Sequence, residues 1–208
     1  MSDTVLLESK NLECIRDNRI LFSQLNFTVQ PHQALILEGD NGCGKTSLLR
    51  ILCGIRLPEQ GQVFWAGQSI QQSASDYYQQ MLYVGHLDGV KRDLSVAENL
   101  HMGAALGRSS GMAIEDALQQ VKLPGYEDVR AQVLSAGQRR RIALAGLLMR
   151  HCPLWILDEP FTALDCASRK IFEALMAKHL EHDGMIVLTS HHPVNLPESA
   201  VQTINLSA

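Results

Sequence analysis

A glycine-rich segment that ends in a lysine and a hydroxyl residue is the strongest chemical signal in the sequence. Residues 39–46 read Gly-Asp-Asn-Gly-Cys-Gly-Lys-Thr and match the pattern G-x-x-x-x-G-K-[ST]. In this pattern the backbone N–H groups bind phosphate oxygens, the lysine neutralises the β- and γ-phosphates, and the hydroxyl binds magnesium. The segment therefore predicts a site for a nucleoside triphosphate with Mg²⁺, with Lys45 on phosphate and Thr46 as a metal ligand.

Two adjacent carboxylates are the second candidate for chemistry. Asp158 and Glu159 directly follow the apolar run Leu-Trp-Ile-Leu at 154–157. A strand that ends in such a pair fits a magnesium ligand followed by a residue that acts on the attacking water. We expect Asp158 to bind the metal and Glu159 to polarise the water. Had the segment stood alone, two solvated acids at a strand end would be the preferred interpretation.

Buried strands that alternate with helices must position these groups. The apolar run at 34–38 predicts a buried strand that leads into the glycine-rich segment, and a helix over 46–55 follows it. Another helix is expected over 166–182, between two further apolar runs. Strands are also expected over 81–85, 154–157, 185–189 and, as an edge strand, 201–206. This alternation predicts an α/β protein with a mainly parallel core sheet.

The remaining segments predict an antiparallel part and a helical part. Residues 5–12 and 20–29 read as paired antiparallel strands, and 61–66 returns to the same sheet. From about 88 to 150 the sequence reads almost wholly helical, with Ser95-Val-Ala-Glu98 as a capping box. Turn residues interrupt this region at 107–111 and at 124–125. We expect one domain over 1–208 into which a helical subdomain of about 88–150 is inserted.

Composition excludes several classes of protein. The 208 residues carry a net charge of −4, so the chain lacks the basic excess of a nucleic-acid binder. The one basic run, 139–141, is expected on the surface of a helix. No apolar stretch reaches the ~20 residues of a membrane span, and the N-terminus has no export signal, so we expect a cytoplasmic chain without direct membrane insertion. Five cysteines without a C-x-x-C pair fit a reducing compartment. Surface positions are expected for His32, His101, His179, His182 and His192.

Residues 134–138 connect these signals to a family. They read Leu-Ser-Ala-Gly-Gln, with Arg141 following, and resemble the LSGGQ signature of ABC ATPases, with Ala136 in place of one glycine. Thr162-Ala-Leu-Asp165 is similar to the D-loop of that family, and Thr189-Ser-His191 is similar to its switch histidine. The resemblance covers essentially the whole chain in the family's order.

The resemblance implies an ATP-hydrolysing dimer in which two copies sandwich two ATP molecules. Each nucleotide would lie between the glycine-rich segment of one copy and the signature of the other, with Glu159 acting on the water and His191 on the γ-phosphate. Cys43, next to a helix N-terminus and near Lys45, is expected to be the most reactive thiol, or else a small residue that fills a tight loop. The implied nucleotide contacts are Gly39, Asn41, Gly42, Cys43, Gly44, Lys45, Thr46, Ser47, Ser135, Gly137, Gln138 and Asp165.

Two positions depart from the ABC pattern. Arg16 stands where most members place an aromatic ring on adenine, and it either stacks on the base through its guanidinium plane or is a solvated turn residue. His86 stands where most members have the Q-loop glutamine. It either takes part in the chemistry or packs against the helical subdomain.

These departures indicate one group of proteins within the ABC family. The run Leu-Tyr-Val-Gly-His-Leu-Asp-Gly-Val-Lys at 82–91 and the Arg16-Asp17 pair are similar to the ATP-binding subunits of cytochrome c maturation (haem exporter) ABC transporters. Membership would imply integral membrane permease subunits as partners and a place on the cytoplasmic face of the bacterial inner membrane. The alternatives are the ATPase of another bacterial ABC importer or lipid exporter and, in a different class, a soluble ABC-type ATPase that acts on DNA or ribosomes.

Overall fold

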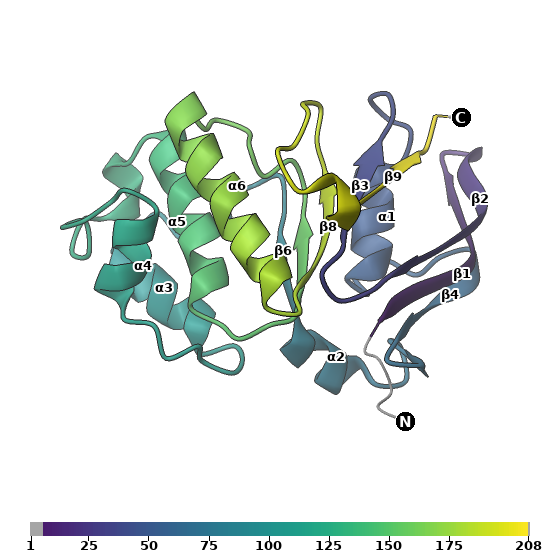
Figure 1. Cartoon of the computed structure of the whole chain (residues 1–208), viewed down its shortest axis with the longest axis horizontal. Helices are drawn as coiled ribbons and strands as arrows, with labels where there is room; N and C mark the ends of the chain where they lie inside the picture. Colours follow the sequence, from purple (N-terminus) through teal and green to yellow (C-terminus); the bar gives the residue numbers. More distant parts are fainter. Residues whose placement is uncertain (1–5, 208) are drawn as a thin grey trace.

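Residues 6–207 form two β-sheets and six α-helices in this computed structural model (Figure 1). Met1, where the expected domain begins, and Val5, the first residue of the first expected strand, lie outside the described residues, as does Ala208. The α/β class with one parallel and one antiparallel sheet is confirmed. No helix within 6–207 combines the length and the apolar composition that crossing a membrane requires.

The central sheet is parallel in all its pairings and has the strand order β6-β7-β8-β3-β9. Its strands span Met81–Val84 (β6), Leu154–Leu157 (β7), Met185–Thr189 (β8), Ala34–Glu38 (β3) and Val201–Asn205 (β9). β7 and β8 are buried along their whole length, which explains why the sequence shows continuous apolar runs instead of alternation. All five strands were expected, and β9 lies at the sheet edge as expected.

The second sheet is antiparallel and has the order β2-β1-β4-β5. Its strands span Leu7–Arg16 (β1), Arg19–Val29 (β2), Gln60–Trp65 (β4) and Gln68–Ser69 (β5). Asp17 and Asn18, at φ 52° and 59°, form the tight turn between β1 and β2. Aspartate and asparagine tolerate this left-handed conformation better than most residues, which is why the turn was readable from the sequence.

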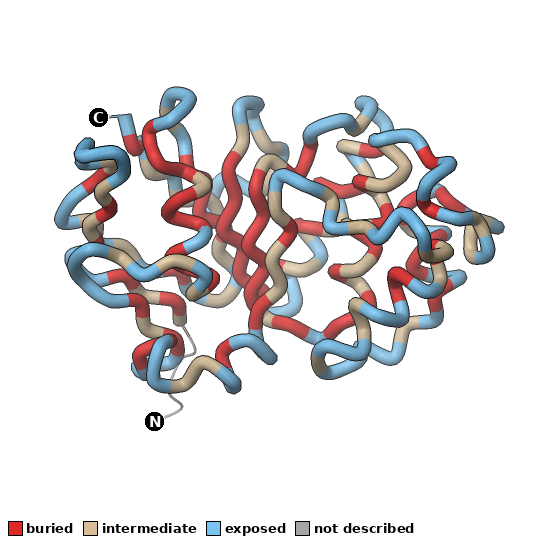
Figure 2. Tube along the Cα trace, turned by 180° about the vertical axis from the view of Figure 1, so that it is seen from behind, coloured by how far each residue is buried: buried red, intermediate tan, exposed pale blue. Residues whose placement is uncertain are grey.

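Helices cover both faces of the central sheet. Leu35 and Leu37 of β3 face a core shared with the antiparallel sheet and α1 (Lys45–Leu52), whereas Ala34 and Ile36 face α6 (Cys166–Glu181). The strands at the centre of the molecule are accordingly the most continuously buried part of the chain (Figure 2). α1 ends three residues before the expected boundary, because Gly54 takes φ 68° and turns the chain away.

The region 88–150 is less helical than expected. It contains α3 (Val96–Ala104), α4 (Ile114–Gln120), α5 (Ala136–Leu148) and a 3₁₀ turn at Ala131–Val133, joined by long irregular segments. The helices share a core of their own and form one end of the molecule (Figure 1). Carbonyl groups of Glu127 and Val129 accept hydrogen bonds from the first N–H groups of α3, at 2.9 and 3.0 Å. The first N–H groups of a helix have no partner within that helix, and residues 127–129 supply carbonyl partners for those of α3. These residues do not form a helix themselves.

Helix α2 (Ala74–Gln80) was missed because its sequence is mostly polar and has no apolar periodicity. Tyr77 is its one buried residue, and the tyrosine hydroxyl donates a hydrogen bond of 2.7 Å to the carbonyl of Leu52. One anchoring side chain gives no periodic pattern, so the sequence could not reveal this helix.

His179 is not the surface residue that was expected. Its ring stacks on Trp155, with centroids 3.8 Å apart, and its Nε2 lies 3.2 Å from the carbonyl oxygen of Pro153. Burial of the ring lowers the pKa of His179 to about 4. The unfolded chain therefore binds a proton more readily than the folded one between about pH 6.5 and pH 4.

We expect the folded state to lose stability as the pH falls through this window, by at most on the order of 3 kcal/mol from this residue. His179→Phe keeps the stacked ring and removes the titration, so its free energy of unfolding should vary less with pH than that of the parent chain. His182→Phe, at the exposed end of the same helix, is the control. Urea unfolding at several pH values measures the difference, and equal pH dependence of the parent and His179→Phe would contradict the prediction.

Candidate nucleotide site

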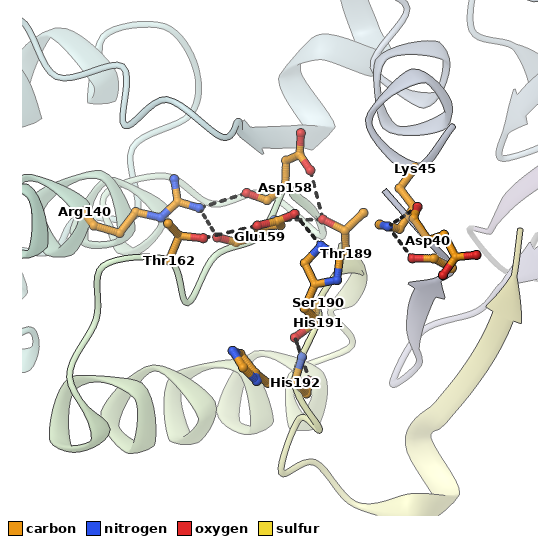
Figure 3. Close-up of polar contacts among 11 residues, drawn as sticks. Asp40, Lys45, Arg140, Asp158, Glu159, Thr162, Thr189, Ser190, His191 and His192 are labelled. Carbon is orange, nitrogen blue, oxygen red and sulfur yellow. Dashed lines mark hydrogen bonds and ion pairs between the residues drawn. The ribbon is translucent and has the colours of Figure 1, made fainter. Parts of the chain in front are cut away.

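The carboxyl ends of four parallel strands bring the predicted residues to one edge of the central sheet. The glycine-rich segment follows β3, the two carboxylates follow β7, His191 follows β8, and His86 follows β6. Because β8 lies between β7 and β3, Thr189 at its end separates Asp158 from the glycine-rich segment (Figure 3). This is the edge at which open parallel sheets bind ligands.

The glycine-rich segment wraps around the lysine side chain. Lys45 is the first residue of α1 and is 7% exposed, and its ammonium group donates hydrogen bonds to the carbonyls of Gly39 at 2.6 Å and Asp40 at 3.0 Å. Gly44, at φ 113°, begins the helix, and a Cβ there would lie 3.0 Å from the Cβ of Leu21 in β2. Only glycine fits this turn, which directs the free N–H groups of α1 into the segment and makes it suited to phosphate.

Asp158 has one carboxylate oxygen without a partner. The side chain is buried, at 2% exposed, and its Oδ1 accepts a 2.9 Å hydrogen bond from the hydroxyl of Thr189. Its Oδ2 is buried without a hydrogen bond to any of the residues that the structure describes. A buried, unpaired carboxylate oxygen is costly unless a cation binds it. Together with the Thr46 hydroxyl at the start of α1, this donor set fits Mg²⁺, which prefers oxygen ligands.

Glu159 is held in a strained position beside the switch histidine. Its backbone takes φ 48°, and its N–H donates a 2.8 Å hydrogen bond to the Thr189 hydroxyl. One carboxylate oxygen of Glu159 lies 3.0 Å from Nε2 of His191, and the other accepts a 3.4 Å hydrogen bond from Thr162. Non-glycine residues keep such a backbone only where surrounding contacts enforce it, often at functional sites. The arrangement aims a carboxylate and an imidazole at the same place.

Thr189 and Arg140 are site residues that the sequence analysis missed. The single hydroxyl of Thr189 connects the carboxylate of Asp158 to the backbone of Glu159. Arg140 is 3% exposed and donates to four carbonyls, those of Gly85, Asp158, Glu159 and Pro160, at 2.7–3.0 Å. Strand register could have indicated Thr189, because β7 and β8 pair from Leu154 to Leu157. No local pattern marks Arg140.

The expectation that the run 139–141 lies on the surface of a helix was wrong for Arg140, which is buried, whereas Arg139 and Arg141 are partly exposed. Burial lowers the pKa of the Arg140 guanidinium from its ordinary value. Arg139 pairs with Asp88 at 3.2 Å, and Arg141 donates to the carbonyls of Val121 and Lys122. The three side chains connect the N-terminal half of α5 to other parts of the chain.

The signature segment forms the start of α5. Ser135 is the N-cap, and Gln138 completes a capping box, with its Oε1 accepting a 2.9 Å hydrogen bond from the Ser135 N–H. A Cβ on Gly137 would lie 2.6 Å from the carbonyl oxygen of Ala163, so glycine is required where this helix meets the segment 162–165. Asp165 caps α6 by accepting a 2.7 Å hydrogen bond from the Ser168 N–H, which lowers the pKa of its carboxyl.

The two departures from the family pattern lie at the margins of the site. Arg16 ends β1 with its side chain 66% exposed and pairs with Asp17 at 3.4 Å. His86 is exposed and lines a groove of about 920 Å³ that Asp158 also lines. The structure places both side chains where they are accessible, and their roles stay predictions.

Cys43 is less accessible than its predicted reactivity requires. It is 8% exposed, and its Sγ packs so closely on Gly39 that a Cβ there would lie 2.7 Å from the sulfur. Cys166, the first residue of α6, is exposed. A maleimide should therefore label Cys166 before Cys43, and Cys166→Ser should remove the fast phase of labelling. Mass spectrometry locates the label, and equal early labelling of Cys43 would contradict this order.

Comparisons with known proteins identify the family of the chain. The family model described as ABC transporter matches residues 22–162. The cytochrome c biogenesis ATP-binding export protein CcmA of Methylococcus capsulatus is 49% identical over 209 residues, which is 100% of both chains. The protein of the same name from Escherichia coli K12 is 43% identical over 202 residues, covering 97% of each.

Two solved structures share the fold. A putative ABC transporter ATP-binding protein from Pyrococcus furiosus matches with a TM-score of 0.81 at 23% identity over 97% of both chains. An ATP-binding cassette solved as a dimer in a post-hydrolysis state with ADP and Pi matches with a TM-score of 0.80 at 19% identity, over 97% of this chain and 95% of that one. The family model and the relatives of 43–49% identity show that the chain belongs to the ABC transporter ATP-binding family, among the cytochrome c biogenesis ATP-binding export proteins.

Proposed function

We propose that this chain hydrolyses ATP to drive the export system of cytochrome c biogenesis, either by moving haem or by releasing its haem-loaded chaperone. The observation that carries the proposal is the pairing of Glu159 with His191 at 3.0 Å, next to the phosphate-binding segment and the unpaired oxygen of Asp158. Relatives named for cytochrome c biogenesis export match the chain over its full length. Nothing in the site favours a second function.

Different residues of the chain have different roles in ATP hydrolysis. Backbone N–H groups at the start of α1 and the Lys45 ammonium bind the β- and γ-phosphates. Glu159 accepts a proton from the attacking water, and His191 holds that carboxylate in place and contacts the γ-phosphate. Asp158 and Thr46 would hold Mg²⁺, which neutralises charge on the phosphate oxygens. Arg16, at the exposed end of β1, would stack on the adenine.

A second copy of the chain completes the site. Ser135 and Gly137 start a helix, and the free N–H groups there suit the γ-phosphate of ATP bound to the other copy. Gln138 and Asp165 cap α5 and α6, and these hydrogen bonds would hold the N-termini of the two helices in position for the nucleotide. The solved dimer with ADP and Pi is similar in fold and supports this assembly.

Integral membrane permease subunits are the expected partners, at the cytoplasmic face of the bacterial inner membrane. The groove between β6 and the helical region is the docking surface, because five large apolar side chains stand exposed along it: Ile55, Tyr78, Leu87, Met102 and Leu106. Monomeric proteins rarely expose so large a group of apolar side chains. Tagged chain purified from detergent-solubilised membranes of its source bacterium should carry polytopic subunits and hydrolyse ATP. Recovery of the chain alone, from the soluble fraction, would contradict the proposal.

His86 is proposed to act on the water or the metal. A glutamine side chain can also accept a hydrogen bond from the water, and it is the residue that most members of the family have here. His86→Gln should therefore stay active, whereas His86→Ala should lose ATPase activity at saturating ATP and magnesium. Parent activity in His86→Ala would show that His86 takes no part in the chemistry.

A further inference from the structure

The segment that carries His191 has little regular structure of its own. Residues 190–197, all of which the structure describes, connect β8 to the 3₁₀ turn at Glu198–Ala200 and form neither helix nor strand. The hydroxyl of Ser190 donates to the carbonyl of His192 at 2.7 Å and accepts from its N–H at 3.1 Å. These two bonds do not reach the imidazole of His191. Irregular surface segments move unless other elements fix them, so the position of this histidine depends on contacts made elsewhere.

A buried acid on α6 binds this segment. Glu173 is 7% exposed, and its Oε1 accepts hydrogen bonds from the N–H of Asn195 at 3.2 Å and from Nε of Arg169 at 3.1 Å. Arg169 also donates from a terminal nitrogen to the carbonyl of Pro193. The two charged side chains lie one turn apart on the helix, where opposite charges stabilise each other. Together they bind one N–H group and one carbonyl of the backbone that follows His191.

Stability does not explain why an acid stands at position 173. Burying a carboxylate costs free energy, and replacing a buried ion pair with apolar residues often leaves a protein equally stable. Glu173 follows Phe172, which is buried in the core between α6 and the central sheet. An apolar side chain at 173 could not accept the hydrogen bond from Asn195. The acid is therefore best explained by the segment that it binds.

Arg169 also contacts the segment that carries Glu159. Its guanidinium carbon lies 4.9 Å from the centre of the ring of Phe161, two residues after Glu159. Phe161 is buried and packs against Phe172 of α6, with ring centres 5.9 Å apart. A guanidinium over an aromatic ring is attracted to it, which limits the movement of both groups. One arginine thus touches both segments that carry the paired groups, Glu159 and His191.

We propose that Glu173 and Arg169 are positioning residues for ATP hydrolysis, which hold His191 beside Glu159 by fixing the backbone after the histidine. The inference rests on the proposed function and adds the contacts that maintain its central pair. The imidazole and the carboxylate lie 3.0 Å apart, and the anchored backbone groups lie two and four residues after His191. Without these anchors the histidine could leave the carboxylate. A displacement of about 1 Å in an active site can lower a rate by about two orders of magnitude.

The pair does not reach the groups that bind phosphate. Lys45 and the rest of the glycine-rich segment follow β3. Within residues 6–207, the side-chain hydrogen bonds of Arg169 and Glu173 join them to each other and to the backbone of residues 193 and 195. Loss of the pair should therefore lower kcat and leave the KM for ATP nearly unchanged. A general disturbance of the fold would not separate these two quantities.

Kinetics of the complex purified from membranes test the pair. Arg169→Met and Glu173→Leu should each lower kcat about tenfold or more, with a KM for ATP within about twofold of the parent value. Glu173→Gln should retain most of the rate, because its amide oxygen can still accept the hydrogen bond from Asn195. Lys170→Met removes an exposed charge next to Arg169 and is the control, which should behave like the parent. Urea unfolding verifies that each variant is folded.

Nuclear magnetic resonance of the full chain reports on His191 itself. With isotope-labelled histidine rings, the signal of His191 is the one that disappears in His191→Gln. We expect this signal to shift in Arg169→Met and in Glu173→Leu, because the imidazole is no longer held beside the carboxylate. It should stay unchanged in Lys170→Met. Arg169 is only partly buried, so Arg169→Met decides the matter if Glu173→Leu does not fold.

The inference and the proposed function fail differently. An unshifted His191 signal, or the parent kcat, in both Arg169→Met and Glu173→Leu would overturn the inference. A KM that rises as much as kcat falls would also overturn it, because the pair would then act on ATP binding. A parent complex without ATPase activity would instead overturn the proposed function. The His191 signal remains readable in a chain that does not hydrolyse ATP, so the two failures are distinguishable.

Discussion

Glu159→Gln is expected to reduce ATP hydrolysis by roughly 10²–10⁴-fold and to leave ATP binding intact. The amide cannot accept the proton of the attacking water, but it has almost the same shape. Glu159 lies beyond the buried Asp158 and pairs with His191, so the glycine-rich segment and the proposed metal ligands are unchanged. Hydrolysis would then no longer release the nucleotide, and an ATP-bound dimer should accumulate.

Steady-state ATPase assays and size-exclusion chromatography with ATP measure both effects. Glu181→Gln, which removes an exposed carboxylate at the end of α6, is the matched control and should behave like the parent. The role assigned to Glu159 is wrong if Glu159→Gln hydrolyses ATP at the parent rate. It is also wrong if the variant binds ATP but never dimerises.

Arg140→Met is expected to have the second largest effect, on stability and on hydrolysis together. Its guanidinium donates to the carbonyls of Asp158 and Glu159 (Figure 3). It also donates to the carbonyls of Pro160 and of Gly85, which precedes His86. Methionine fills similar space but leaves these buried acceptors without donors. We expect a loss of roughly 2–5 kcal/mol in the free energy of unfolding, because each unsatisfied acceptor carries a desolvation cost.

Hydrolysis should fall at least tenfold, because catalytic rates depend steeply on the position of the reacting groups. Arg141→Met is the control, since among residues 6–207 Arg141 donates to the carbonyls of Val121 and Lys122 and not to those of residues 158–160. Urea unfolding gives the stability, and ATPase assays under conditions where both variants are folded give the rate. If Arg140→Met is as stable and as active as Arg141→Met, the hydrogen bonds from Arg140 to the four carbonyls are not required for stability or hydrolysis.

Elements with a continuous local pattern could be predicted from the sequence. β3, β7 and β8 are buried on both faces, so their apolar runs mark them within one or two residues. The glycine-rich segment is a contiguous motif, and its conformation depends on three glycines within six residues, Gly39, Gly42 and Gly44. Asp158 and Glu159 could be placed at the same edge because parallel strands end together.

Features that depend on contacts distant in sequence could not be predicted. Arg140 looks like a surface arginine in a basic run, and its partners lie 18 to 55 residues away. His179 looks like a polar residue near a helix end, but its ring is buried against Trp155, and this burial lowers its pKa. The helical content of 88–150 was overestimated because the carbonyls of 127 and 129 bind the start of α3, a contact that no local pattern reveals.

The most direct measurement is the amount of covalently haem-bearing c-type cytochrome in the source bacterium when its own copy of this chain carries Glu159→Gln. Haem-dependent peroxidase staining of membrane and periplasmic proteins after electrophoresis provides the readout, with immunoblotting to verify that the variant accumulates normally. We predict that haem-bearing c-type cytochromes disappear in this strain and persist in one that carries Glu181→Gln. Normal levels in the Glu159→Gln strain, with ATP hydrolysis abolished in the purified variant, would contradict a role for this ATPase in cytochrome c biogenesis.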